Sequence, residues 1–247
     1  NSDIWRMPRA GGESVQITTD VADEFMPEQS PDGAWLAYYS LRHGSRDIFV
    51  RPTGHGDPVR VTSDPEEETQ PHWSPDGTKL CYGQLSTRAS QYSIRTVRRL
   101  EGGWSTPVTL PGAGGRSNRF FGCVGWLPGG RELVVHDAER TMIAIMPDEG
   151  GAARVIYRQD PARGLPQPIW IRLEPRTGTI FFRDWQSIWL IDPKSLVPRQ
   201  IVRFNDPTRH STRIEMESDG ERVYFTLGDP QSELNTARLS GPSTRRN

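Results

Sequence analysis

A short phrase recurs along this chain and constrains the fold more than any other feature of the sequence. Trp73-Ser74-Pro75-Asp76-Gly77 is nearly repeated at Gln29-Ser30-Pro31-Asp32-Gly33. Weaker copies stand at residues 126–130, 174–178 and 217–220, and each copy is followed by a short apolar run. The glycines that close the five copies lie 42 to 53 residues apart. A period of this length predicts a repeat protein built from β-hairpins.

Each repeat contains the signals of four β-strands. Asp-Gly favours a tight hairpin turn, because Gly accepts positive φ and Asp can bond the backbone inside the turn. The first strand precedes this turn, the second follows it, the third ends at a proline, and the fourth follows a turn with Gly or Pro. Second strands are predicted at 34–39, 79–82, 132–135, 179–182 and 222–225, third strands at 4–8, 48–52, 143–147 and 189–193, and fourth strands at 15–17, 59–61, 108–110, 155–157 and 201–202. Such units predict an all-β protein, a β-propeller of four-stranded blades.

The predicted blades also suggest how the ring is composed. Residues 1–8 align with residues 45–52, so the first predicted blade holds only its third and fourth strands. We expect six blades, the first incomplete, with strands at about 211–217, 222–227 and 232–239 in the last. A five-bladed ring, closed by the two N-terminal strands, is the alternative, and it leaves Ser232 to Leu239 without a place. We expect one domain over 1–240 and a disordered polar tail at 241–247.

Charge, hydropathy and motifs exclude several classes of function. The net charge is -1, so the basic excess that nucleic-acid binding requires is absent. No run of about 18 apolar residues is present, so we expect no membrane span within this sequence. The sequence has no Gly-x-Ser-x-Gly, and its five histidines show no His-x-His or His-x3-His spacing. We therefore expect no catalytic set, no metal and no cofactor.

The two cysteines, Cys81 and Cys123, both fall in or beside apolar strands of successive repeats. We expect buried free thiols, because an unpaired Cys behaves as a small hydrophobic residue. A disulfide between them is the alternative, and its geometry cannot be derived from sequence. Two cysteines alone do not decide the redox compartment.

The recurring phrases resemble the repeat of TolB-type β-propellers, whose pattern is Trp-Ser-Pro-Asp-Gly, an apolar strand, and then an Asp-Ile-aromatic strand. Trp73 to Gly77 matches fully, Ser30 to Gly33 matches with Gln29 in place of Trp, and Asp3-Ile4-Trp5 and Asp47-Ile48-Phe49 match the later part. The resemblance covers most of residues 1–110 and weakens after 120. It implies a propeller, in many cases a bacterial, periplasmic one that binds other envelope proteins. Similar propellers are also attached to serine peptidases, protein kinases and polysaccharide lyases.

The loops that lead into the first strands carry opposite charges in different repeats. Acidic residues precede two early strands, namely Asp20, Asp23, Glu24 and Glu28, and then Asp64, Glu66, Glu67 and Glu68, whereas later loops carry Arg116 and Arg119, and then Arg209, His210 and Arg213. A solvated loop explains each run alone. In a propeller these loops share one face around the channel mouth, and the alternative is a docking face for a charged protein. Phe120 and Phe121 join this set, because they lie in a Gly-rich segment, Gly112 to Gly122, that resembles a binding-loop insertion. The candidate partner-binding residues are Glu66, Glu67, Glu68, Arg116, Arg119, Phe120, Phe121, Arg209, His210 and Arg213.

The sequence therefore predicts a non-enzymatic, extracytoplasmic propeller that binds other proteins, as an accessory subunit of an envelope or membrane-bound complex. One alternative is a glycan-binding or lyase-like propeller, in which His72 and His210 meet at the channel beside arginines that suit sugar carboxylates. Another is a sensor or gating propeller that forms part of a larger kinase or peptidase.

Overall fold

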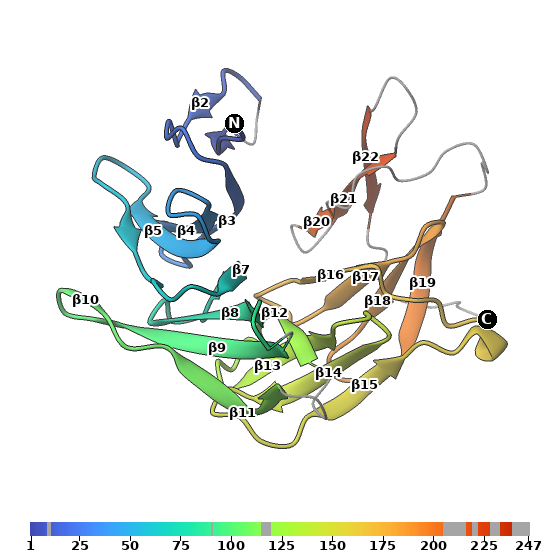
Figure 1. Cartoon of the computed structure of the whole chain (residues 1–247). Helices are drawn as coiled ribbons and strands as arrows, with labels where there is room; N and C mark the ends of the chain where they lie inside the picture. The colour runs from blue at the N-terminus through green and yellow to red at the C-terminus, as the bar shows by residue number, and fades with distance from the viewer. Residues whose placement is uncertain are drawn as a thin grey trace. The chain divides into compact units, whose positions relative to one another are not determined.

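The computed structural model describes residues 1–8, 11–89, 91–114, 120–204, 216–218, 222–227 and 233–238. The described residues form antiparallel sheets and one 3-10 helix of three residues, so no described helix could cross a membrane. The chain divides into two compact units. Unit 1 comprises Asn1–Ala138 and Ile145–Ala153, and unit 2 comprises Glu139–Ala144 and Arg154–Asn247 (Figure 1).

Unit 1 begins with a two-stranded sheet and continues with a complete four-stranded one. The first pairs β1 (Trp5–Arg6) with β2 (Val15–Gln16). The second has the order β3-β4-β5-β6, with β3 at Glu24–Gln29, β4 at Trp35–Ser40, β5 at Asp47–Pro52 and β6 at Val59–Arg60. Sequence order equals spatial order, which is the meander expected of a propeller blade.

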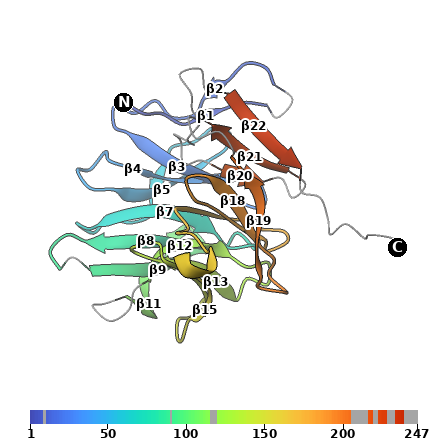
Figure 2. The ribbon, with the colours of Figure 1, turned by 90° about the vertical axis from the view of Figure 1, so that its right-hand side faces the viewer.

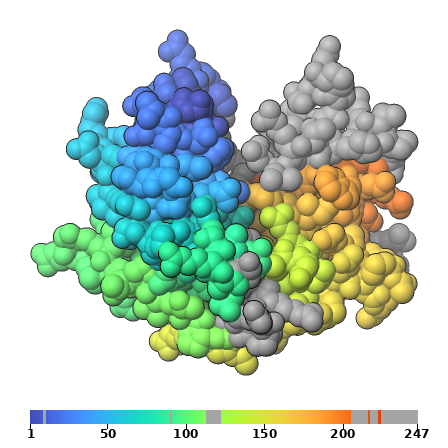
Figure 3. Space-filling model, viewed as in Figure 1, coloured from blue at the N-terminus to red at the C-terminus, as the bar shows by residue number. Residues whose placement is uncertain are grey.

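The next sheet of unit 1 lies beside the β3–β6 sheet, as Figure 2 shows. It contains β7 (Glu67–Trp73), β8 (Lys79–Ser86), β9 (Gln91–Leu100), β10 (Gly103–Trp104) and β11 (Val108–Gly114). Both β10 and β11 pair with β9, at different parts of its length, so together they occupy the place of the fourth strand. The β9–β10 hairpin projects from unit 1 (Figure 3).

Two further four-stranded sheets follow. One has the order β12-β13-β14-β15, with β12 at Phe120–Trp126, β13 at Glu132–Asp137, β14 at Met142–Pro147 and β15 at Arg154–Arg158. The 3-10 helix η1 (Pro161–Arg163) leads on to β16 (Trp170–Leu173), β17 (Ile180–Arg183), β18 (Ser187–Ile191) and β19 (Pro198–Arg203) in unit 2. A three-stranded sheet pairs β20 (Met216–Ser218), β21 (Arg222–Leu227) and β22 (Glu233–Arg238).

The Pro-Asp-Gly turns are built by the residues that recur in the sequence. The Asp76 carboxylate accepts hydrogen bonds from the Ser74 hydroxyl at 2.6 Å and from the Thr78 backbone N–H at 3.0 Å. The bond from Ser74 is the main reason why the pKa of Asp76 lies below its ordinary value. Gly77 has φ +68°, a left-handed conformation that Gly adopts without strain. The phrase is therefore a turn motif, and its residues recur along the chain because each of these turns needs the same hydrogen bonds.

The first two repeats are equivalent in their irregular backbone as well as in their turns. Met26 in β3 and Gln70 in β7 lie 44 residues apart, and both have positive φ, 53° and 55°. Each occurs at a register shift against the next strand, which identifies a β-bulge. The backbone N–H of Glu24 donates to the Ser2 carbonyl, and that of Glu68 donates to the Arg46 carbonyl, both at 2.8 Å. Each of these bonds fixes the start of one sheet to the turn before the third strand of the preceding sheet.

Apolar residues of the two neighbouring sheets form one core cluster in unit 1. Its buried members are Ala37, Tyr39, Ile48, Val50, Trp73, Leu80, Tyr82 and Val97. The Trp73 ring is almost fully buried, and its Nε1–H donates to the Glu28 carbonyl at 3.1 Å. Trp therefore suits the first position of the phrase, because it fills the space between sheets and also satisfies its polar atom.

The structure confirms the all-β class and the four-stranded blades. The predicted third strands at 48–52 and 143–147 lie within β5 and β14, and the predicted strand 222–227 coincides with β21. Four sheets are complete among the described residues, so the number of blades, six or five, stays a prediction. The predicted tail at 241–247 lies outside the described residues.

Candidate functional site

The acidic residues that the sequence singled out gather at the starts of β3 and β7, in unit 1. We call this set the acidic edge: Asp20, Asp23, Glu24, Asp64, Glu66, Glu67 and Glu68. Asp20 and Glu24 of the first loop are the repeat equivalents of Asp64 and Glu68 in the second, 44 residues later. The acidic edge therefore consists of two copies of one loop, and three arginines contact it.

Glu68 lies at the bottom of the second loop and is fully buried. Its carboxyl accepts hydrogen bonds from the Thr62 hydroxyl and from the Gln84 amide, each at 3.0 Å. Burial, and after it a hydrogen bond with Asp64, raises the pKa of Glu68 to about 9. Glu68 is therefore protonated at neutral pH. We had expected Glu68 at the surface as a partner-binding residue, but its buried side chain supports the loop from inside.

Asp64 carries the negative charge of this pair. Burial works to raise its pKa, but the hydrogen bond with Glu68 and the charge of Arg95 outweigh that effect, so the pKa is lowered. The Arg95 guanidinium lies 2.7 Å from the Asp64 carboxylate. The Gln84 amide also donates to both Asp64 oxygens, at 3.1 Å each. Asp64 is thus ionised and held by two partners from β8 and β9.

Glu66 and Glu67 lie at the surface of the same loop and are partly exposed. The Glu66 carboxylate accepts the Thr87 backbone N–H at 2.8 Å and the Ser86 hydroxyl at 3.0 Å. Glu67 forms an ion pair with Arg46 at 3.6 Å. Both carboxylates are held in defined positions, and each leaves part of its surface open to solvent.

The first loop repeats this construction with different partners. The Glu24 carboxylate is buried and accepts bonds from the Ser40 hydroxyl and the Arg42 guanidinium, both at 3.3 Å. Arg42 also contacts Asp20 at 3.4 Å. Val21, between the acidic residues, is 95% exposed. With Glu68 protonated, the acidic edge retains three more carboxylates than the arginines that contact it, so its charge is negative.

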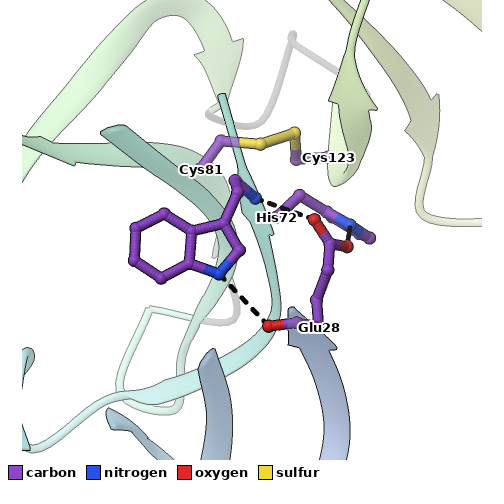
Figure 4. The surroundings of a disulfide bond; sticks show 5 residues. Glu28, His72, Cys81 and Cys123 are labelled. Carbon is purple, nitrogen blue, oxygen red and sulfur yellow. Dashed lines mark hydrogen bonds and ion pairs between the residues drawn. A yellow bond between two sulfur atoms is a disulfide. The ribbon is translucent and has the colours of Figure 1, made fainter. Parts of the chain in front are cut away.

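His72, a candidate for sugar chemistry, joins two sheets of unit 1, whereas His210 lies outside the described residues. Figure 4 shows its ring against Glu28, with Nδ1 lying 2.5 Å from Oε2. The other Glu28 oxygen accepts the backbone N–H of Trp73 at 2.9 Å. The Glu28 side chain of β3 therefore bonds two successive residues of β7. Within the described residues, no group of three or more metal-binding side chains occurs.

Cys81 and Cys123 form a disulfide, so the prediction of two free thiols was wrong (Figure 4). Cys81 lies in β8 and Cys123 in β12, the first strand of the next sheet, and their Cα atoms are 6.3 Å apart. Both residues are buried, at 0% and 1% exposure. The apolar surroundings are the same for a thiol and for a disulfide. Only the packing of one sheet against the next brings the two sulfur atoms together.

Unit 2 contains an open groove of about 490 Å³ that the sequence did not indicate. It is lined by Gly164, Pro166, Asp184, Trp185, Gln186, Ser187, Trp189, Gln200 and Arg203. These residues come from the loop before β16, the β17–β18 turn, strand β18 and the edge strand β19. Trp185, at the tip of the turn, is 60% exposed. We call this feature the Trp185 groove.

The remaining predicted site residues fall outside the part of the chain that the structure describes in full. Arg116, Arg119, Arg209, His210 and Arg213 belong to undescribed segments. Phe120 and Phe121 begin β12, and only their backbone is described. The expected opposition of acidic and basic loops stays a prediction.

Known structures with similar folds support a propeller assignment. No family model matches this sequence, and no curated protein sequence does. TolB from Acinetobacter baumannii superimposes with a TM-score of 0.65 and 11% identity, over 90% of this chain and 56% of that one. A puromycin-hydrolyzing peptidase of Mycobacterium tuberculosis superimposes with a TM-score of 0.65 and 15% identity, over 99% of this chain and 41% of the peptidase chain. A chain of a nidogen/laminin complex superimposes with a TM-score of 0.66 and 11% identity, over 92% of this chain and 84% of that one.

These similarities establish the fold and no more, because all three identities are low. The chain has a TolB-like β-propeller fold, as its Pro-Asp-Gly phrases predicted. It spans about half the length of the first TolB chain, and less than half of the peptidase. Proteins that share this fold include both enzymes and protein-binding modules, so the function must be argued from the residues of this chain.

Proposed function

We propose that this chain is a non-enzymatic propeller of an extracytoplasmic compartment, and that it binds a basic protein surface through the acidic edge. The observation that carries the proposal is the repeated construction of that edge. Two equivalent loops each rest on a buried carboxyl, Glu24 or Glu68, and display partly exposed carboxylates above it. Loops that are already ordered lose little conformational entropy on binding, which favours affinity.

The disulfide supports the extracytoplasmic location. Cys81 and Cys123 join two neighbouring sheets, and both are buried. Structural disulfides persist in oxidising compartments and are rare in reducing ones. A role in protein binding also fits the structural similarity to TolB and to a chain of a nidogen/laminin complex. The specific role that we propose is an accessory subunit of an envelope or membrane-bound assembly.

The charge and the exposed apolar residue of the acidic edge would both favour one kind of partner over others. Its negative charge would attract a basic partner and repel acidic ones. Val21, which is 95% exposed between Asp20 and Asp23, offers an apolar contact at the centre of the first loop. Charge would then determine the orientation of the partner, and burial of Val21 would contribute to its retention.

Charge reversal of the two exposed glutamates tests the proposal. We expect the double variant Glu66→Arg/Glu67→Arg to capture the partner from a membrane extract at least about tenfold less well, since like charges now face each other. The loss should diminish at high salt, because ions screen exposed charges. Capture is measured by quantitative mass spectrometry after affinity purification.

A matched control uses two exposed glutamates of the same unit, Glu101 and Glu149. Both lie in turns after the third strand of their sheets, at the opposite end from the acidic edge. The variant Glu101→Arg/Glu149→Arg changes the net charge equally and should capture the partner as the wild type does. Equal capture by all three proteins would refute the proposed edge.

A further inference from the structure

The Trp185 groove presents a large aromatic surface to solvent in unit 2. Trp185 is 60% exposed, although burial of an indole ring is strongly favourable. Its position in the β17–β18 turn places it at one side of the groove, whereas Gly164 and Pro166 of the preceding loop line another part. An exposed aromatic ring beside a concave surface is a common feature of ligand sites.

Three aromatic rings in successive contact, Trp189, Phe182 and Tyr157, brace the groove. The Trp189 ring stacks on Phe182, with centroids 5.9 Å apart and an angle of 6° between the planes. Phe182 in turn contacts Tyr157 at 4.6 Å, and the Tyr157 hydroxyl donates to the Pro166 carbonyl at 2.5 Å. The three rings therefore link the Trp189 wall of the groove to its Pro166 wall. A groove braced in this way is preformed for a ligand.

The polar groups of the groove fall into two classes. Asp184 is already satisfied, because it accepts bonds from the Gln186 backbone N–H at 2.6 Å, the Ser187 hydroxyl at 2.5 Å and the Trp189 Nε1–H at 3.2 Å. The Gln200 amide and the Arg203 guanidinium, in contrast, have no hydrogen-bond partner among the described residues. The groove therefore offers one cation and one amide to a ligand, together with the Trp185 ring.

We infer that the Trp185 groove binds an acidic oligosaccharide, one that carries uronic acid carboxylates. A pyranose has an apolar face of C–H groups that can lie on an indole ring, while its hydroxyls require amide and charged partners such as Gln200. The guanidinium of Arg203 can bind a sugar carboxylate through two parallel hydrogen bonds. The lining combines the apolar indole surface with polar side chains, which is the combination that the apolar face and the hydroxyls of a sugar require. This site is separate from the acidic edge, and it does not depend on the proposed protein partner.

Calorimetric titration with a glucuronic-acid-containing tetrasaccharide tests the inference. We expect saturable binding by the wild type, and an affinity lower by about tenfold or more in Trp185→Ala, which loses the stacking surface. Arg203→Met should lower the affinity for the acidic tetrasaccharide by about tenfold but leave that for its carboxyl-reduced form unchanged. The controls are Trp5→Ala, which removes another exposed indole, and Arg199→Met, which removes another exposed charge of β19.

Three results would overturn the inference. The first is no binding of the tetrasaccharide by the folded wild type. The second is equal affinity for the acidic and the carboxyl-reduced forms, together with no effect of Arg203→Met. The third is that an acidic, proline-containing peptide binds in a Trp185-dependent way while the tetrasaccharide does not, which would assign the groove to a protein ligand. Thermal unfolding of each variant confirms that a lost affinity does not reflect a lost fold.

Discussion

Reduction of the Cys81–Cys123 disulfide is expected to lower the free energy of unfolding by about 4 kcal/mol. The bond closes a loop with a sequence separation of 42, and a crosslink of that span restricts the unfolded chain by roughly this amount. It also joins two sheets that are otherwise linked by packing, by the Lys79–Asp148 ion pair and by the hydrogen bond from the Gly151 N–H to the Pro111 carbonyl. Urea unfolding of the oxidised and the reduced wild type, followed by tryptophan fluorescence, measures the difference.

The double variant Cys81→Ala/Cys123→Ala serves as a control for effects of the reductant. It should unfold at nearly the same urea concentration with and without reductant, and close to the reduced wild type. If the oxidised and reduced wild-type proteins unfolded at the same urea concentration, the disulfide would not stabilise the fold, and the main support for an oxidising compartment would be lost.

The buried carboxyl of Glu68 is expected to make the fold less stable in alkaline solution. Its folded pKa is about 9, whereas its unfolded value is 4.5. The protonated form is therefore favoured by folding, and this stabilisation is complete below about pH 4.5 and is lost as the pH rises toward about 9. We expect the free energy of unfolding to fall by about 3 kcal/mol between about pH 4.5 and pH 9. This fall is smaller than the full difference between the two pKa values would give, because local opening lets water reach the ionised group.

Asp64 has the opposite dependence, because its pKa is lowered in the folded state. Its contribution is present above its unfolded pKa and is lost in acid, so it cannot cause a loss of stability in alkali. The variant Glu68→Gln should show a flatter dependence between pH 5 and pH 9, while the exposed-site control Glu132→Gln should follow the wild type. Parallel curves for the wild type and Glu68→Gln would show that Glu68 is ionised in the folded protein.

The sequence was sufficient to predict the strands and turns because their signals are local. The Pro-Asp-Gly phrase places Ser74 and Asp76 within a few residues of the N–H groups that they bond, so the turn follows from the sequence itself. The apolar runs after each turn predicted the second strands, which the structure finds as β4, β8, β13, β17 and β21. The repeat period then combined these local predictions into blades.

The features that the sequence did not predict depend on contacts between distant segments. Glu67 and Glu68 are neighbours in the same acidic run, yet one is at the surface and the other is buried against Thr62 and Gln84. Successive residues of β7 face opposite sides, which places Glu67 outward and Glu68 inward. The 44-residue match of Glu68 to Glu24 was visible in the sequence, and it was the available signal for a structural role.

The Trp185 groove could not be predicted for the same reason. Its residues come from four segments, and Gln200 and Arg203 carry no motif. Trp185 and Trp189 were apparent as aromatic residues, but the sequence could not show that one ring is exposed and the other is stacked on Phe182. Strand pairing at β17, β18 and β19 brings these side chains together.

Photo-crosslinking in living cells tests the central claim most directly, namely that the acidic edge contacts a protein outside the cytoplasm. A photoreactive amino acid replaces Glu67 in one protein and Glu149 in another, and both are irradiated in cells before fractionation. We predict a covalent adduct with one protein of the envelope or membrane fraction from position 67, and none from position 149. Adducts from position 149 alone, or no protein adduct from position 67 while the chain is folded and oxidised, would contradict the account.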